Sequence, residues 1–150
     1  MAAFQFRLAT LLKLRESERR QRQIESAQAL EAERILQRQA EAVANDIALA
    51  KAKLREASSP GELPVDSLLE FQRYTLQLTA QALVVAEQMS TLRAEVERRR
   101  QVLIEADRTV RTLEKLRDQQ AATFRLEAET RERKMFDEIA QQQFFQTRGD

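Results

Sequence analysis

The 150-residue chain contains only two glycines and two prolines, too few for a compact fold with many turns, and its abundant Ala, Glu, Gln, Arg and Leu is typical of long helices. Its 25 basic and 24 acidic residues nearly cancel, so general affinity for nucleic acid is not expected. The absence of cysteine and histidine excludes disulfides, thiolate zinc sites and Ser/His/Asp or Cys/His catalytic arrangements.

The first predicted helix extends from about residue 5 to residue 57, and its second half carries an apolar repeat. The repeat advances by alternating steps of three and four residues, which is typical of a coiled-coil seam, because slight underwinding keeps the stripe facing one partner. Its members are Leu36, Ala40, Val43, Ile47, Ala50, Leu54 and Ala57. The repeat weakens at RESERRQRQ, residues 15–23, so we expect a splayed or mobile region there.

Residues 58–66 form the predicted turn. Both prolines and Gly61 fall in its SSPGELP stretch, where proline cannot continue a helix and glycine permits a sharp change of direction. Ser67 and Glu70 follow with the spacing of a capping box, and Asp66 is an alternative cap. A second helix is therefore predicted to begin at about residue 67.

The second predicted helix extends to about residue 145 and carries a longer repeat of the same kind. Only a threonine, two arginines and a glutamine interrupt its apolar character, so the seam is expected to continue over many turns. Its members are Leu68, Phe71, Thr75, Leu78, Ala82, Val85, Met89, Leu92, Val96, Arg99, Leu103, Ala106, Val110, Leu113, Arg117, Gln120 and Phe124.

The two stripes approach the turn from opposite sides, which predicts an all-α fold in which residues 1–150 form one antiparallel coiled-coil hairpin. Folding at the turn brings together large pairs, such as Leu54 with Phe71, and smaller pairs, such as Ala50 with Thr75, so that large and small residues alternate along the seam. At 1.5 Å per residue the helices would extend roughly 75 Å and 115 to 120 Å. The N-terminus then lies near Gln120, and about 25 C-terminal residues, which follow from the difference in helix length, overhang without a partner helix.

Apolar residues lie at both ends of the chain. The stretch FQFRLATLL occupies residues 4–12, and the overhang contains Met135, Phe136, Ile139, Phe144 and Phe145. The N-terminal stretch could cap the coil, but its position at the same tip as the C-terminal residues favours a partner surface.

Sequence features that support catalysis are scarce. No phosphate-binding loop motif occurs, and carboxylates on exposed helices have no pocket that would shift their pKa. We therefore expect no enzyme activity and no cofactor or metal. The run from Arg98 to Arg100 is interpreted as a solvated face on which Arg99 covers the seam with its aliphatic stem. The apolar runs are shorter than the roughly 20 residues of a membrane-spanning helix, and no signal-peptide core occurs, so we expect a soluble cytoplasmic protein.

Three stretches resemble, at matching relative positions, the flagellar export protein FliJ family. They are FQFRLATLLKLRESE at the start, VERRRQVLIEADRTVRTLEKLRD at residues 96–118 and RERKMFDEIA at residues 131–140. The resemblance covers essentially the whole chain. Because coiled coils share glutamate, arginine and leucine content, the more specific signal is the ordered occurrence of pieces such as LEKLR and KMFDEIA.

The resemblance implies a non-catalytic component of the flagellar type III export apparatus, similar to the rotor stalk of rotary ATPases. The end that carries both termini would insert into the hexameric ring of the export ATPase and promote its assembly and activity. The resemblance also implies contacts with the cytoplasmic part of the export gate and with export chaperones, and hence a peripheral association with the inner face of the cell membrane.

Candidate contact residues follow from these two expectations. The predicted ATPase-docking set is Phe4, Phe6, Leu8, Leu11, Leu12, Met135, Phe136 and Ile139. The predicted gate-contact set is Tyr74, Leu78, Gln81 and Val85, which share one helical face at spacings of four, three and four. Leu78 and Val85 also lie on the predicted seam, so the gate contact requires either that the hairpin opens or that Tyr74 and Gln81 make it alone.

Two alternative functions stay open at this point. One is the related stalk of a virulence-type secretion system. The other, from a different class, is a coiled-coil chaperone or structural spacer that holds clients at a splayed tip, which would explain the same apolar ends.

Overall fold

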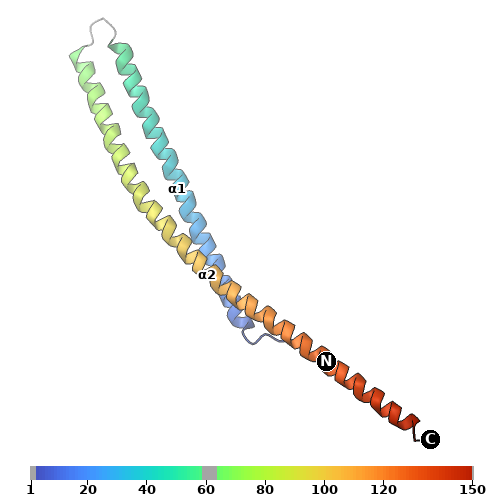
Figure 1. Cartoon of the computed structure of the whole chain (residues 1–150). Helices are drawn as coiled ribbons and strands as arrows, with labels where there is room; N and C mark the ends of the chain where they lie inside the picture. Colours follow the sequence, from blue (N-terminus) through green and yellow to red (C-terminus); the bar gives the residue numbers. More distant parts are fainter. Residues whose placement is uncertain (1–2, 59–63, 150) are drawn as a thin grey trace. The chain divides into compact units, whose positions relative to one another are not determined.

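The computed structural model describes residues 3–58 and 64–149 and contains two long helices, α1 (Ala9–Ala57) and α2 (Val65–Thr147) (Figure 1). Glu33 of α1 lies 3.4 Å from Arg93 of α2. Arg99, later in α2, hydrogen-bonds Glu25, which is earlier in α1. The helices therefore run antiparallel and pack against each other, and the predicted all-α hairpin is confirmed. Gly61 and most of the predicted turn lie outside the described residues.

Helix α1 begins at Ala9, four residues later than predicted. The carbonyl of Leu8 accepts the first helical hydrogen bond, from the Leu12 N–H at 2.8 Å, and the Phe6 carbonyl accepts from Ala9 at 3.1 Å. Residues 3–6 form no regular structure, and the ring of Phe4 packs against α2 instead. This tertiary contact takes precedence over the local helix propensity of the segment.

Helix α2 begins at Val65, where the carbonyl of Pro64 accepts a hydrogen bond from the Leu68 N–H at 3.2 Å. The predicted capping box is therefore wrong, because Ser67 already lies inside the helix. Proline lacks an N–H and so loses no hydrogen bond at a helix start. Asp66 is not the cap either, but it lies in the first turn, where its negative charge is favourable beside the positive end of the helix dipole.

The chain divides into two compact units, which are described separately. The turn unit comprises Gln21–Ile104, and the terminal unit comprises Met1–Arg20 with Glu105–Asp150. The assignment of residues 1–150 to a single domain stays a prediction.

The core of the turn unit follows the predicted seam. Its buried apolar side chains are Ala29, Val43, Ala50, Leu78, Val85 and Met89. In the predicted register Glu33 lies opposite Leu92, and the ion pair that it forms is with the next residue, Arg93. The alternating steps of three and four therefore predict both the buried face and the pairing of the helices.

The predicted loosening at residues 15–23 is wrong within the terminal unit. In the turn unit Ser26 and Ala29, which lie after this stretch, are buried and continue the repeat backwards from Leu36. In the terminal unit Arg19 reaches across to Asp107, with Nη1 3.3 Å from Oδ1. The seam thus continues through residue types that hydropathy does not reveal, because serine is small and the arginine stem is apolar while its head finds a carboxylate.

In the terminal unit Val110 is fully buried and Leu12 nearly so. The predicted seam fails at Gln120, which is exposed, and Ala121 is half-buried in its place. Here α2 faces the irregular segment before α1 instead of a helix, so a strict 3.5-residue period is no longer required.

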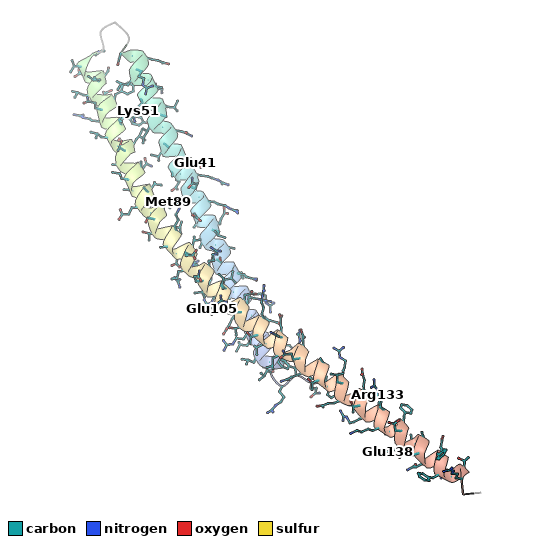
Figure 2. All side chains as sticks on the ribbon, viewed as in Figure 1. Glu41, Lys51, Met89, Glu105, Arg133 and Glu138 are labelled. Carbon is teal, nitrogen blue, oxygen red and sulfur yellow. The ribbon has the colours of Figure 1, made fainter. Side chains whose placement is uncertain are left out.

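The C-terminal overhang is confirmed. Every residue from Glu129 to Gly149 is exposed, and Figure 2 shows side chains projecting outward around Arg133 and Glu138. This part of α2 has no helix of the described chain beside it.

Candidate functional site

The N-terminal half of the predicted docking set is largely packed against α2. The ring centroids of Phe4 and Phe124 lie 5.8 Å apart at an interplanar angle of 50°. Phe6 and Leu11 are half-buried, and Leu12 is buried. Within this half Leu8 is the exposed member, so the segment acts structurally as an apolar cover of α2.

The C-terminal half of the set is accessible. Phe136 is 70% exposed, and Met135 and Ile139 are exposed to 61% and 47%. Ile139 lies four residues after Met135 and three after Phe136, so it is between these two side chains on a broad face of α2 about 100° wide. Phe144 and Phe145 lie on other faces and contact each other edge to face, with centroids 6.4 Å apart, while Arg148 lies 5.2 Å from the Phe144 ring centroid.

The structure separates the two halves along α2. Phe136 lies twelve residues beyond Phe124, or about 18 Å along the helix axis. From Phe124, steps of four, seven and four residues lead to Ala128, Met135 and Ile139. Steps of this size keep residues on one side of a helix, so Met135 and Ile139 nevertheless continue the face that Phe4 covers at Phe124. The predicted single tip is therefore one apolar stripe, covered at its start by the N-terminal segment and uncovered beyond it.

The predicted gate-contact set is divided by the seam. Leu78 and Val85 are buried against α1, whereas Tyr74 and Gln81 are exposed. Tyr74 also lines a groove with Phe71 and Leu49, in which the exposed Leu49 lies one position before the buried Ala50. Sequence reasoning missed Leu49 because it followed only the seam positions of the first helix.

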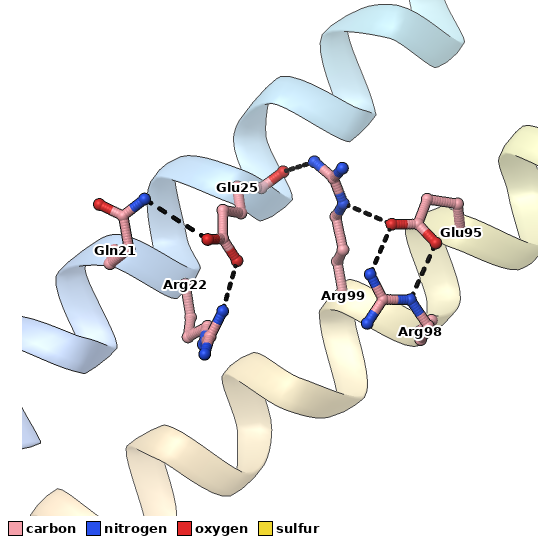
Figure 3. Close-up of polar contacts among 6 residues, drawn as sticks. All are labelled: Gln21, Arg22, Glu25, Glu95, Arg98 and Arg99. Atoms are coloured by element: carbon pink, nitrogen blue, oxygen red, sulfur yellow. Dashed lines mark hydrogen bonds and ion pairs between the residues drawn. The ribbon is translucent and has the colours of Figure 1, made fainter.

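A cluster of charged side chains joins the two helices of the turn unit (Figure 3). Arg99 donates from Nη1 to the backbone carbonyl of Glu25 at 2.9 Å and from Nε to Glu95 at 2.7 Å. Arg98 donates two further hydrogen bonds to the same carboxylate, at 2.8 and 2.7 Å. The interpretation of Arg99 as a residue on the seam is consistent with its half-buried position, but its guanidinium also bridges the helices.

These hydrogen bonds change the acidity of the two carboxyl groups. Donation by Arg98, followed by that of Arg99, lowers the pKa of Glu95 to about 2. Donation by Arg22, followed by that of Gln21, lowers the pKa of Glu25. Charge-assisted hydrogen bonds favour the ionised form of both groups, and Glu95 stays anionic well into the acid range.

Comparison with known families identifies the chain. The family model described as Flagellar FliJ protein matches residues 4–149. The chain belongs to the FliJ family. No curated protein and no solved structure matched the chain. As a FliJ-family protein it is a component of the flagellar export apparatus, and the family is one of non-catalytic accessory proteins.

Two further observations concern a possible metal site and a possible membrane-spanning helix. Among residues 3–58 and 64–149, no group of three or more acidic side chains is arranged to hold a metal ion. In the same residues, neither helix contains a stretch apolar and long enough to span a bilayer.

The FliJ-family chain should lose the contribution of Glu95 to stability in acid. Its folded pKa lies below the ordinary value of 4.5, so that contribution is present above about pH 4.5 and is lost as the pH falls toward about 2. Thermal unfolding should therefore show wild type melting higher than Glu95→Gln at pH 7, with the difference shrinking below pH 4.5 and becoming small at about pH 2. A difference that stays constant over this range would contradict the assigned hydrogen bonds.

Proposed function

We propose that this protein is a non-catalytic stalk that inserts its terminal unit into the ring of the export ATPase and stimulates the assembly and turnover of the ring. The observation that carries the proposal is the uncovered apolar stripe on the overhang, with Met135, Phe136 and Ile139 exposed on a single helix. A helix of this kind leaves apolar surface in water unless a partner covers it. A ring with a central channel is a partner that surrounds a single helix.

Stimulation follows from differential binding. A stalk that touches several ring subunits at once binds the assembled ring more tightly than separate subunits, and so shifts the equilibrium toward the ring. Met135 and Ile139 supply apolar contact, while the charged residues around them, such as Arg131 and Asp137, limit the orientations in which the helix docks.

Measuring the oligomeric state and turnover of the export ATPase, alone and with this protein, tests the proposal. The expected result is a shift toward hexamer and a higher rate per subunit. Stable binding without any change in either quantity would contradict the proposed stimulation, and absence of binding would contradict the docking itself.

The proposed gate contact uses Tyr74 and Gln81, whose exposed side chains leave the seam intact. We expect Tyr74→Ala with Gln81→Ala to weaken binding to the cytoplasmic domain of the export gate by about tenfold or more, since an exposed tyrosine is a common interface anchor. Isothermal titration checks this, and thermal unfolding should remain unchanged. Gln72→Ala with Thr79→Ala, which are also exposed on α2 but lie on a different face from Tyr74 and Gln81, is the matched control. If both double variants bind equally, the gate contact lies elsewhere.

Export chaperones are proposed as further partners on the cytoplasmic side of the apparatus, with the protein held near the membrane only through these assemblies. Membership of the FliJ family favours a flagellar over a virulence-type system. A chaperone holding clients in a splayed tip is less well supported, because Arg19 and Asp107 keep the helices in contact at the region where splaying was expected.

A further inference from the structure

The turn unit carries a second apolar stripe on α2, on the face away from the seam. Leu69, Leu76 and Leu83 follow one another at seven-residue intervals, and Leu76 and Leu83 are each 69% exposed. Leu76 lies two residues before the buried Leu78, which places it about 200° round the helix. Leucine at every seventh residue is the pattern of a helix–helix seam, so this face is suited to a second helix.

The charge pattern around this stripe is unusual for the chain. No charged residue occurs in residues 74–86, although 33% of the whole chain is charged. Burying this face would therefore desolvate few polar groups and no ion. Charges of opposite sign flank it, with Arg73 at one end and Glu87 at the other. Both are exposed, and neither forms an ion pair with a described residue.

The two charges that flank the stripe are symmetric about Ala80. Arg73 precedes Ala80 by seven residues and Glu87 follows it by seven. When two copies of α2 lie antiparallel with Ala80 at the two-fold axis, Arg73 comes opposite the partner's Glu87, and the symmetry makes this pair twice. A parallel arrangement would instead bring like charges together.

Apolar contacts agree with the same register. Leu76 comes beside the partner's Leu83, again twice, and the small side chain of Ala80 lets the helices approach closely at the axis. The next positions of the seven-residue series, Ser90 and Glu97, are polar, so the stripe ends there. From Leu69 to Ser90 the contact covers about 32 Å of helix, which suits a weak, concentration-dependent association.

We propose that this face is a two-fold antiparallel contact between two copies of the chain, centred on Ala80. The stripe lies on α2 opposite the side that packs on α1, so the hairpin stays intact in the dimer. The proposal rests on the turn unit alone and is independent of any contact with the export ATPase.

Charge reversal in the full chain tests the contact by sedimentation equilibrium. Arg73→Glu and Glu87→Arg, made singly, should each raise the dissociation constant of the dimer by about tenfold or more, because each places two pairs of like charges across the axis. The double variant R73E/E87R should recover dimerisation, since the pairs are restored with reversed sign. Circular dichroism should be unchanged, as both residues are exposed.

Cysteine cross-linking tests the register, and the chain contains no native cysteine. Ala80→Cys should form a disulfide-linked dimer under oxidation, because the two residues meet at the axis within the roughly 7 Å between Cα atoms that a disulfide spans. Gln72→Cys, on the same face, should not form a disulfide-linked dimer, because in this register it lies near the partner's Glu87 and far from the partner's Gln72.

Three results would overturn the proposal. They are efficient cross-linking through Gln72→Cys, failure of the double charge reversal to recover dimerisation, and a wild-type chain that stays monomeric at all concentrations. The last would leave this face to a helix of a different protein.

Discussion

Replacing Leu78 by Ala should lower the free energy of unfolding by about 2 to 4 kcal/mol, because it removes a buried side chain and leaves a cavity in the seam. Leu78 is 6% exposed and packs between α1 and α2. Val110→Ala, which deletes two methyl groups from a fully buried site in the terminal unit, should cost about 2 kcal/mol. Urea unfolding followed by circular dichroism measures both changes.

Leu76→Ala is the matched control for Leu78→Ala, because it makes the same substitution two residues away at a side chain that is 69% exposed. We expect it to change the free energy of unfolding by less than about 0.5 kcal/mol when measured in dilute solution, where any self-association is negligible. Equal losses from the two variants would show that the seam is not where Leu78 lies.

Replacing Met135, Phe136 and Ile139 together by Ala should abolish most of the stimulation of the export ATPase while leaving helicity unchanged. At about 25 cal/mol per Å² of buried apolar surface, the loss of three exposed side chains weakens binding by a few kcal/mol, or roughly a hundredfold or more. Alanine favours helix, and none of the three side chains is buried in the folded chain, so the stability should not fall.

Leu126→Ala is the control for this variant, because Leu126 is 64% exposed and lies on the side of the same helix opposite Met135, nine residues away. Full stimulation by the triple variant would remove the docking role of the overhang.

The N-terminal triple variant, with Phe4, Phe6 and Leu8 replaced by Ser, should behave differently. It removes the cover over Phe124, so lower thermal stability should accompany any loss of stimulation.

The two long helices and their antiparallel register could be predicted from the sequence. Steps of three and four residues decide which face of each helix is apolar, and a single proline-containing break leaves few other ways to pair the faces. The ion pair of Glu33 with Arg93 lies within one residue of that register. The overhang could also be predicted, because it follows from the difference in helix length.

The helix starts and the polar part of the seam could not be predicted in this way. Capping-box spacing at Ser67 competes with Pro64, whose carbonyl starts the helix. At Arg19, hydropathy gives no sign of burial, because the partner that makes it possible, Asp107, lies 88 residues away in the chain. Long-range pairs of this kind depend on how the helices are positioned in space.

The candidate site was predictable in composition but not in arrangement. The pattern of residues was enough to predict which residues are apolar at the two ends and that Leu78 and Val85 belong to the seam, but it left open whether the hairpin opens to expose them. The structure buries both and leaves Tyr74 and Gln81 accessible in the gate-contact set. The folded arrangement was needed to learn that Phe4 covers Phe124 while Phe136 stays exposed about 18 Å further along α2. The physical reason is that periodicity specifies the face of a helix on which a residue lies, whereas its exposure depends on which other segment reaches that face.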